Sequence, residues 1–435
     1  MKRQSASLLL WALLIAARQA HTQTMDMQGV ENTAGFISSG TSIEPKTTSE
    51  FSPMVHRPLG NWTLMFHANA FVASIQQSGP RGKDKLFSTN WFMPMLSREL
   101  GRHVIAFHPM LSLEPATVTH RRYPELFQTG ETAYGLPIVD GQHPHDLFME
   151  LAGRYEFRFS DRTQMFLYGG PIGDPALGPA AYPHRASASE NPMAVLGHHE
   201  EDSTHISNSV ITLGVVSGPL QLEASTFHGR EANENRWNID GGEPDSFSSR
   251  LTIAPASNLT GQFSIGRINN REALEPDLDT LRTTASIHHN LQFSSGHAAS
   301  SIVWGRNEDM DHADKRIFNS YTVESTVNFL KRNWVWTRIE NVDRDRSLLA
   351  GESPAAVHIE EKPIGRVQAY SFGYERDLAV RIPSVNLGLG VQATAYGLTP
   401  QLKTVYGNHP VALVAFLRLR PSGNMAEHMR TMHGR

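Results

Sequence analysis

The chain has 435 residues, with 39 Lys and Arg against 43 Asp and Glu, and a net charge of −4. Because nucleic-acid binding needs a basic surface, this balance excludes nucleic acid as an expected partner. The lack of cysteine in the sequence excludes disulfides, thiolate metal sites and a cysteine nucleophile. A mean hydropathy of −0.34 argues against a bundle of membrane helices.

The N-terminus is predicted to be a signal peptide, residues 1–20. Met1, Lys2 and Arg3 form a basic start, and residues 8–17 (LLLWALLIAA) form an apolar run. A membrane-spanning helix needs about 20 residues, whereas this shorter run is typical of a secretory signal. The cleavage site is expected between Ala17 and Thr22. The alternative is a retained anchor or a buried helix.

Beyond the signal, many segments alternate apolar and polar residues. Within residues 62–70 (WTLMFHANA), the apolar Trp62, Leu64 and Phe66 recur at every second position. A period of two with one apolar face indicates a half-buried β-strand. Sixteen strands are predicted, at 61–76, 86–99, 103–113, 147–159, 163–169, 204–216, 220–229, 246–254, 259–268, 280–293, 297–306, 316–330, 333–344, 364–376, 384–396 and 410–420.

The links between these strands alternate strictly between short and long. The short links are turns such as 100–102, 160–162 and 294–296, and the long links include 114–146 and 170–203. Short periplasmic turns and long extracellular loops are typical of outer-membrane barrels, which have an even number of strands. The sequence therefore predicts an all-β fold, a single antiparallel transmembrane β-barrel of about 16 strands. A secreted soluble β-sandwich pair or a propeller is the alternative.

The expected organisation has three parts after the signal. Residues 21–60 are expected to form a largely irregular periplasmic segment, 61–420 the outer-membrane β-barrel and 421–435 a C-terminal tail. The last strand contains Phe416, but a tail follows it, whereas many outer-membrane barrels end on an aromatic residue. The expected location is the outer membrane of a Gram-negative bacterium, reached by secretion through the inner membrane.

Charged residues alternate along some of the predicted strands. Arg154, Glu156 and Arg158 share one face of a strand, as do Glu223 and Ser225 on another. Charges on a lipid-facing side would cost about 2–4 kcal/mol near the bilayer midplane, so these side chains are expected to face the lumen. A barrel of this size leaves a water-filled lumen unless loops fill it. The leading hypothesis is therefore a porin-like channel for small polar solutes.

Several blocks between about residues 120 and 240 carry a family resemblance. They are LFQTGE (126–131), DGQHPHDLFMELAG (140–153), GGPIGDPALGP (169–179), YPHRASA (182–188), DSTHISNSVITLG (202–214) and FHGREANENRW (227–237). With these blocks the chain resembles an uncharacterised family of predicted Gram-negative outer-membrane β-barrel proteins. The resemblance implies a secreted, barrel-type protein and, through some relatives, a link to metal resistance.

Two long loops carry clustered histidines and carboxylates. The candidate metal ligands in these loops are His143, His145 and Asp146 in the first, and His198, His199 and His205 at the end of the second. Imidazole and carboxylate suit zinc, copper, nickel or iron. In a barrel both loops lie at the extracellular end, where one His pair from each would make a four-ligand site. The alternative is that these histidines tie large loops together by hydrogen bonds.

The C-terminal tail carries a second candidate metal site. Its residues at helical spacing are Met425, His428, Met429, Met432 and His433. On a helix all five would share one face. Thioether sulfur and imidazole together favour Cu(I) over hard ions, so a copper-contacting tail is predicted, with an inert tail as the alternative. The candidate cofactor of the protein is therefore copper or another divalent transition metal.

An enzyme is not expected. The segment 202–205 contains Asp, Ser and His, but no GxSxG motif accompanies it, and proximity in sequence is not triad geometry. An outer-membrane lipid-modifying enzyme is therefore the third hypothesis, after a channel and a copper-binding or copper-resistance barrel. The expected partners are outer-membrane lipid and small solutes or metal ions. A homo-oligomer is expected by analogy with porins of this size.

Overall fold

The computed structural model describes residues 31–32, 34–271, 277–310, 316–352, 362–380, 382 and 384–422. Within these residues, sixteen antiparallel strands close into one barrel, which confirms the all-β prediction. The strands are β5 (Trp62–Gln77), β6 (Lys85–Leu100), β7 (His103–Leu111), β10 (Phe148–Ser160), β11 (Thr163–Gly173), β12 (Ser207–Ser217), β13 (Leu220–His228), β14 (Ser246–Ala256), β15 (Leu259–Ile268), β16 (Thr280–Phe293), β17 (Gly296–Asp309), β18 (Ile317–Phe329), β19 (Asn333–Asp345), β20 (Pro363–Asp377), β21 (Val385–Leu398) and β22 (Val411–Pro421). The predicted bounds lie within four residues of these.

The barrel closes between its first and last strands. On one side β22 pairs with β21, and on the other side it pairs with the second part of β5. A short strand, β4 (Val55–Leu59), pairs with the first part of β5. Phe416 on β22 points into the barrel, where its ring packs against Phe71. Closure leaves no unpaired sheet edge between the first and last strands.

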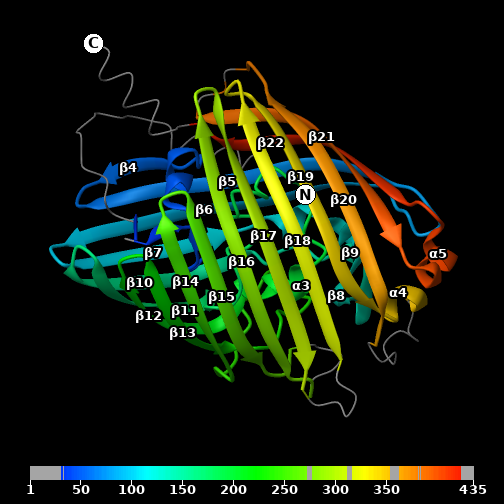
Figure 1. Cartoon of the computed structure of the whole chain (residues 1–435), viewed down its shortest axis with the longest axis horizontal. Coiled ribbons are helices and arrows are strands. Elements are labelled where there is room, and N and C mark those ends of the chain that lie inside the picture. The colour runs from blue at the N-terminus through cyan, green and yellow to red at the C-terminus, as the bar shows by residue number, and fades with distance from the viewer. Residues whose placement is uncertain are drawn as a thin grey trace, which may run out of the picture.

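Short and long links alternate around the barrel, as predicted. At one end the strands are joined by turns such as 161–162, and at the other end by long loops such as 112–147 and 174–206. Figure 1 shows the helices of two further long loops, α4 (Ser347–Ala350) and α5 (Pro400–Tyr406), at the same end of the barrel. The two ends are called the short-turn end and the long-loop end below.

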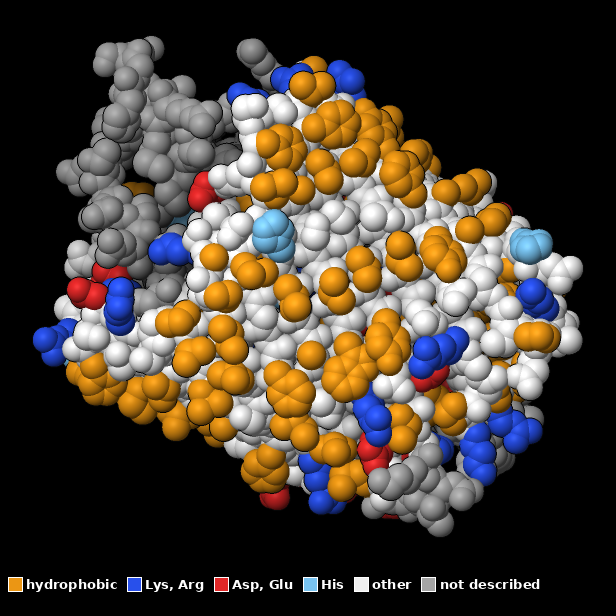
Figure 2. Space-filling view, viewed as in Figure 1, with side chains coloured by type: hydrophobic (Ala, Val, Ile, Leu, Met, Phe, Trp, Pro, Cys, Tyr) orange, Lys and Arg blue, Asp and Glu red, His pale blue; other side chains and the backbone are white. Residues whose placement is uncertain are grey.

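Side chains alternate between the outside and the inside of the barrel. Exposed apolar residues on the outward faces include Leu167, Leu213, Phe247, Ile302 and Phe372. Figure 2 shows such side chains spread over the strands of one face, with most charged side chains toward the edges of the view. The inward faces bury the polar residues Arg154, Glu156, Gln221, Glu223 and Ser225. The expected lumen orientation of these polar side chains is therefore confirmed.

A long loop folds into the lumen. Nearly every residue of 174–205 is buried, including the short helices α3 (His198–Glu201) and η3 (Ser203–His205). The loop hydrogen-bonds to inner side chains of β5, β13, β15, β16, β18, β19 and β22. It therefore spans the barrel from wall to wall.

The segment before the barrel also lies inside it. Residues 38–45 are buried, and the segment contains β2 (Gly35–Ile37), β3 (Ile43–Glu44) and the single-turn helix η1 (Lys46–Glu50), with β1 (Glu31–Asn32) beside β2. The Thr47 amide donates to the carbonyl of Ser257 in a short turn, so this segment occupies the short-turn end. Residues 34–54 and 174–206 together are called the plug below.

The long loop before β10 has its own structure, which periodicity did not predict. It contains α2 (Glu114–Thr117), η2 (Thr119–Arg121) and a hairpin of β8 (Tyr123–Ala133) and β9 (Leu136–Gln142). Among the described residues, no helix is long and apolar enough to cross a membrane.

Candidate functional site

A buried ion-pair network fixes the long loop in the lumen. Arg185 in the loop donates from Nε to Glu324 Oε2 at 2.9 Å, and Arg338 on β19 donates from Nε to Glu324 Oε1 at 2.7 Å. All three side chains are buried. Arg338 Nη1 also donates to the carbonyls of Met193 and Ala194, at 2.9 and 2.7 Å. Buried charges need such partners, so the network holds the loop in one position against β18 and β19.

The N-terminal part of the plug is tied to both the loop and the wall. Ser39 Oγ donates to Asp174 Oδ2 at 2.6 Å. Arg250 on β14 donates from Nη2 to Thr41 Oγ1 and from Nε to Glu223 Oε2, each at 2.9 Å. Burial raises the pKa of Asp174 to about 7, although the charge of Arg250 opposes the shift. The two plug segments are therefore joined through a carboxyl group that titrates near neutral pH.

The structure brings the predicted loop histidines together. The ring centroids of His145 and His205 are 5.5 Å apart, and those of His198 and His205 are 5.2 Å apart. The rings of His143 and His199 lie 6.4 Å apart between centroids. Imidazoles from two loops that are distant in sequence thus form one group, called the loop-histidine cluster.

Three rings of the loop-histidine cluster are held by hydrogen bonds through Nδ1. His145 Nδ1 lies 3.0 Å from Glu114 Oε1, and His198 Nδ1 lies 2.6 Å from Asp202 Oδ1. His205 Nδ1 lies 2.9 Å from the carbonyl of Asp202. The Nε2 atoms of His145 and His205 are buried without a hydrogen-bond partner. Across the described ranges, however, no group of three or more His, Asp or Glu is arranged to hold a metal ion, so metal binding here stays a prediction.

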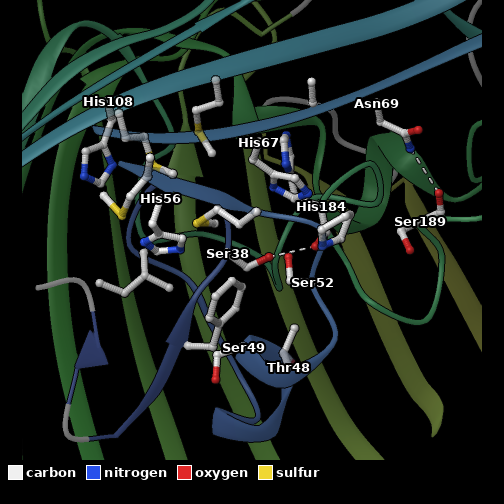
Figure 3. Close-up of a pocket in the computed structure, with 18 of the residues that line it drawn as sticks. Ser38, Thr48, Ser49, Ser52, His56, His67, Asn69, His108, His184 and Ser189 are labelled. Carbon is white, nitrogen blue, oxygen red and sulfur yellow. Dashed lines mark hydrogen bonds between the residues drawn. The ribbon is translucent and has the colours of Figure 1, made fainter. Parts of the chain in front are cut away.

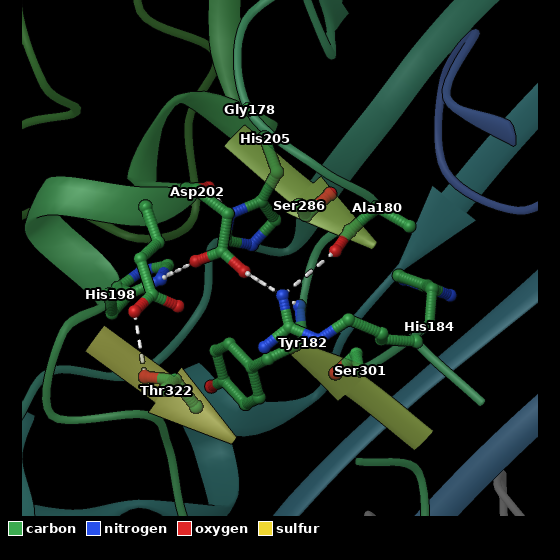
Figure 4. Close-up of polar contacts among 12 residues, drawn as sticks. Gly178, Ala180, Tyr182, His184, His198, Asp202, His205, Ser286, Ser301 and Thr322 are labelled. Carbon is green, nitrogen blue, oxygen red and sulfur yellow. Dashed lines mark hydrogen bonds and ion pairs between the residues drawn. The ribbon is translucent and has the colours of Figure 1, made fainter. Parts of the chain in front are cut away.

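Asp202 organises the charge of this cluster. Burial alone would raise its pKa, but the hydrogen bond and charge of His198 and the charge of Arg185 lower it to about 2. Burial lowers the pKa of His205 to about 3, so this ring is neutral at pH 7, and burial also lowers the pKa of His198. Figure 4 shows His198, Asp202 and His205 close to Tyr182 and His184. Neutral imidazoles with fixed Nδ1 atoms suit either metal ligation or structural support.

Asp146, predicted as a metal ligand, is an ion-pair partner here. It lies 3.3 Å from Arg236, which also contacts Glu131. Glu234 in the same loop as Arg236 contacts Arg121. These pairs join loop 229–245 to loop 112–147 over the long-loop end. The ion-pair partners of Glu234 and Arg236 therefore lie in a different loop.

A cavity of about 430 Å³ remains between the plug and strands β4–β7. Its lining includes Met54, Met65, Met93, Met95, His56, His67, His108 and His184. In Figure 3 the four histidines surround the space, and sulfur atoms lie among them. The Trp91 ring packs against His184, with 4.2 Å between centroids. None of the predicted site residues that the structure describes lines this cavity, which is called the methionine–histidine cavity below.

Three histidines of this cavity carry ring nitrogens without a hydrogen-bond partner. These atoms are Nδ1 of His56, Nε2 of His108 and both ring nitrogens of His184. The side chains of His108 and His184 are buried, and burial holds the pKa of His184 well below its usual value. An unpaired buried polar atom costs about 1–3 kcal/mol, so these rings are candidates for binding a ligand from outside the chain.

The second predicted metal site lies outside the described residues. This applies to Met425, His428, Met429, Met432 and His433, and to the predicted signal peptide. The copper-contacting tail and the signal peptide therefore stay predictions.

No protein-family model and no curated protein matches the chain. Among solved structures it is similar to an anion-selective porin from Comamonas acidovorans, at 12% identity and a TM-score of 0.49, over 82% of this chain and 99% of that chain. It is also similar to Salmonella typhi OmpF in complex with daunomycin, at 8% identity and a TM-score of 0.48, over 84% and 100%. For OccK3 of Pseudomonas aeruginosa the identity is 12% and the TM-score 0.38, over 81% and 94%. The family resemblance and its link to metal resistance stay predictions.

Proposed function

We propose that this chain is an outer-membrane β-barrel of porin type that passes or contacts small polar solutes. The observation that carries the proposal is a closed barrel with an apolar outer face and a charged inner face. Soluble proteins rarely expose apolar patches larger than a few hundred Å². In a bilayer such a face is favoured, and a closed barrel pairs the backbone groups that lipid would leave unsatisfied. The short-turn end would then face the periplasm and the long-loop end the exterior.

The plug restricts the proposed channel. Residues 34–54 and 174–206 occupy the lumen beside the methionine–histidine cavity, so we expect solute passage to increase when one of them moves. Loop 174–206 is attached to a strand at both ends and is held by the Glu324 ion pairs. The N-terminal segment precedes the barrel and can leave the lumen without breaking a strand connection. We infer that it is the part that opens.

Conductance in planar bilayers tests this proposal. A variant whose mature chain begins at Pro53 should conduct several-fold more than the full chain, because it lacks the N-terminal part of the plug. Lys46→Gln, which keeps the segment and changes an exposed residue, should conduct like the full chain. Folding of each protein is checked by its heat-modifiable mobility in gels. A folded truncated variant that never conducts, or a chain found free in the periplasm, would contradict the porin proposal.

Metal binding by the loop-histidine cluster is a second candidate function. It is favoured by the buried, unpartnered Nε2 atoms of His145 and His205. Replacing His143 and His145 by Ala, or His198 and His199 by Ala, should abolish binding of one equivalent of divalent metal. Unchanged stoichiometry in both variants would assign these histidines to structural support of the loops.

A further inference from the structure

Methionine and histidine face each other across the first two long strands. Met65 and His67 lie two residues apart on β5, and Met93 and Met95 lie two residues apart on β6. The register places Met65 opposite Met95 and His67 opposite Met93. Directly opposite residues point to the same face, with Cβ atoms about 4.5–5.5 Å apart. The four side chains therefore form one compact patch on the lumen side.

The pattern continues on the strands at either side. On β4, His56 stands opposite the β5 methionine. On β7, the pairing of Phe107 with Leu96 of β6 brings His108 and Met110 opposite the two β6 methionines. The result is two parallel rows, one of His56, Met65, Met95 and His108, and one of His67, Met93 and Met110.

Packing alone is a weak explanation of this arrangement. Six of the nine methionines that the structure describes belong to a single cluster: Met54, Met65, Met93, Met95, Met110 and Met149. Methionine is a flexible filler of irregular gaps. A filler does not require imidazoles beside it, yet His108 and His184 are buried here with unpartnered ring nitrogens. Thioether sulfurs and free imidazole nitrogens at one place are a set of metal ligands.

We propose that the methionine–histidine cavity binds a soft monovalent cation, Cu(I) or Ag(I). The ligands are thioether sulfurs of Met65, Met93 and Met95 together with a ring nitrogen of His108 or His184. Soft thioethers select Cu(I)-like ions over hard cations. The site concerns binding and stands whether or not the barrel conducts.

The surroundings favour a soft ion over a borderline divalent ion. Zinc or Cu(II) would need several imidazole or carboxylate ligands. In the part of the chain that the structure describes, no three His, Asp or Glu side chains are arranged for this purpose. The carboxylate of Glu150 lies beside the rows, with its Oε1 3.8 Å from His108 Nδ1. Nε2 of the same ring has no hydrogen-bond partner and is free to bind the ion.

Silver binding to the full-length folded protein tests the proposal. The protein is loaded with Ag(I) in detergent, desalted and analysed for bound silver. The double substitution Met93→Leu with Met95→Leu keeps the side-chain volume and removes two sulfurs. It should lose one equivalent of silver, or bind that equivalent at least tenfold more weakly. Met65→Leu, on the neighbouring strand, should show the same defect and serves as the second variant if the double variant does not fold.

Two controls locate the silver. Met165→Leu removes a methionine from the outer face of β11 and should bind as much silver as the unchanged protein. A chain without residues 423–435 lacks the methionines of the tail. It should still bind the equivalent of silver that the double variant loses. The proposal is wrong if the folded double variant and folded Met65→Leu retain all of the bound silver. It is also wrong if the equivalent of bound silver disappears when the tail alone is removed.

Discussion

The two sides of the lumen use different chemistry to meet the plug. On the β13–β19 side, Arg250 is paired with Glu223, and Arg185 and Arg338 share Glu324, all of them buried. On the β4–β7 side the inner face carries rows of methionine and histidine, and a cavity separates it from the plug. On the first side each of these charged groups has an oppositely charged partner within the chain, whereas ring nitrogens of the second side lack partners.

This difference separates anchoring from binding. A buried charge that loses its partner is strongly unfavourable, so ion pairs define one position for the plug. Thioethers carry no charge and adapt their rotamers, so the methionine side tolerates an empty cavity or an added ligand. We therefore expect the ion-paired side to set the stability of the plug and the methionine side to set what the lumen binds.

The largest effect is expected from Glu324→Ala. The substitution leaves Arg185 and Arg338 buried without their shared carboxylate, which should lower the free energy of unfolding by about 3–5 kcal/mol. The midpoint of urea unfolding measures this loss. Ser325→Ala, at the neighbouring and less buried position, removes only a hydrogen bond to Ser300 and should lower the value by about 0.5–1.5 kcal/mol. Equal midpoints for the two variants would show that the network does not anchor the loop.

A smaller loss is expected from Thr41→Val. It removes the hydroxyl that accepts a hydrogen bond from Arg250 Nη2 at 2.9 Å, at a cost of about 1–3 kcal/mol. Because Thr41 belongs to the N-terminal part of the plug, bilayer conductance should rise as well. Thr404→Val in the exposed part of α5 is the control and should change neither quantity. A stable Thr41→Val protein with unchanged conductance would place the anchor of this segment elsewhere.

The pH dependence of stability tests the contact between the plug segments. Burial raises the pKa of Asp174 from its usual 3.8 to about 7. A raised carboxyl pKa means that the folded state binds more protons, so stability should fall as pH rises from about 4 to 7 and this contribution should be constant above 7.

Asp174→Asn removes this titration and keeps an acceptor for Ser39. The stability of the variant relative to the unchanged protein should therefore increase between pH 5 and pH 8, as measured by urea midpoints at both values. Asp161→Asn in an exposed short turn is the control and should show a constant difference. A constant difference for Asp174→Asn as well would mean that Asp174 is already ionised in the folded protein at pH 5.

The smallest effect on stability is expected on the methionine side. Met65→Leu conserves volume and should change the free energy of unfolding by less than about 1.5 kcal/mol. The same variant should nevertheless bind Ag(I) more weakly, so its binding and stability effects separate. A stability loss as large as that of Glu324→Ala would show that the methionines are needed for folding, which would remove the contrast between the two sides.

The barrel itself was predictable because its signals are local. Alternation along each strand depends only on which side chains face the outside or the lumen of the barrel, and Arg154 and Glu156 were expected to point inward for that reason. The strict alternation of turns and loops then fixed the topology. The link between Phe416 and Phe71 follows from closure, since the first and last strands must meet.

The plug was not predictable by the same means. Residues 34–54 have no strong periodicity, and their burial depends on contacts such as that between Thr41 and Arg250, which are distant in sequence. The hairpin of β8 and β9 was hidden because Phe127 and Glu131 adopt positive φ and interrupt the alternation. The loop histidines lie near one another, but their hydrogen-bond partners depend on how the loops fold into the lumen.

The residues of the methionine–histidine cavity have a regular spacing in the sequence that was not interpreted as a site. Met65 with His67, Met93 with Met95, and His108 with Met110 each lie two residues apart, on three consecutive predicted strands. Spacing alone does not give the register between strands. Because neighbours such as Phe66 are also apolar, the sequence does not show which face of the strand points into the lumen. The structure supplied both, by pairing the β5 residues directly with those of β6.

The most direct measurement is the position of silver in crystals of the full-length protein soaked with Ag(I), located by anomalous diffraction. The contrast between the two sides of the lumen predicts a peak inside the cavity, within bonding distance of methionine sulfurs from β5 and β6. A peak among His145, His198 and His205 with none in the cavity would contradict it, because silver would then bind to the loop imidazoles and not beside the methionines.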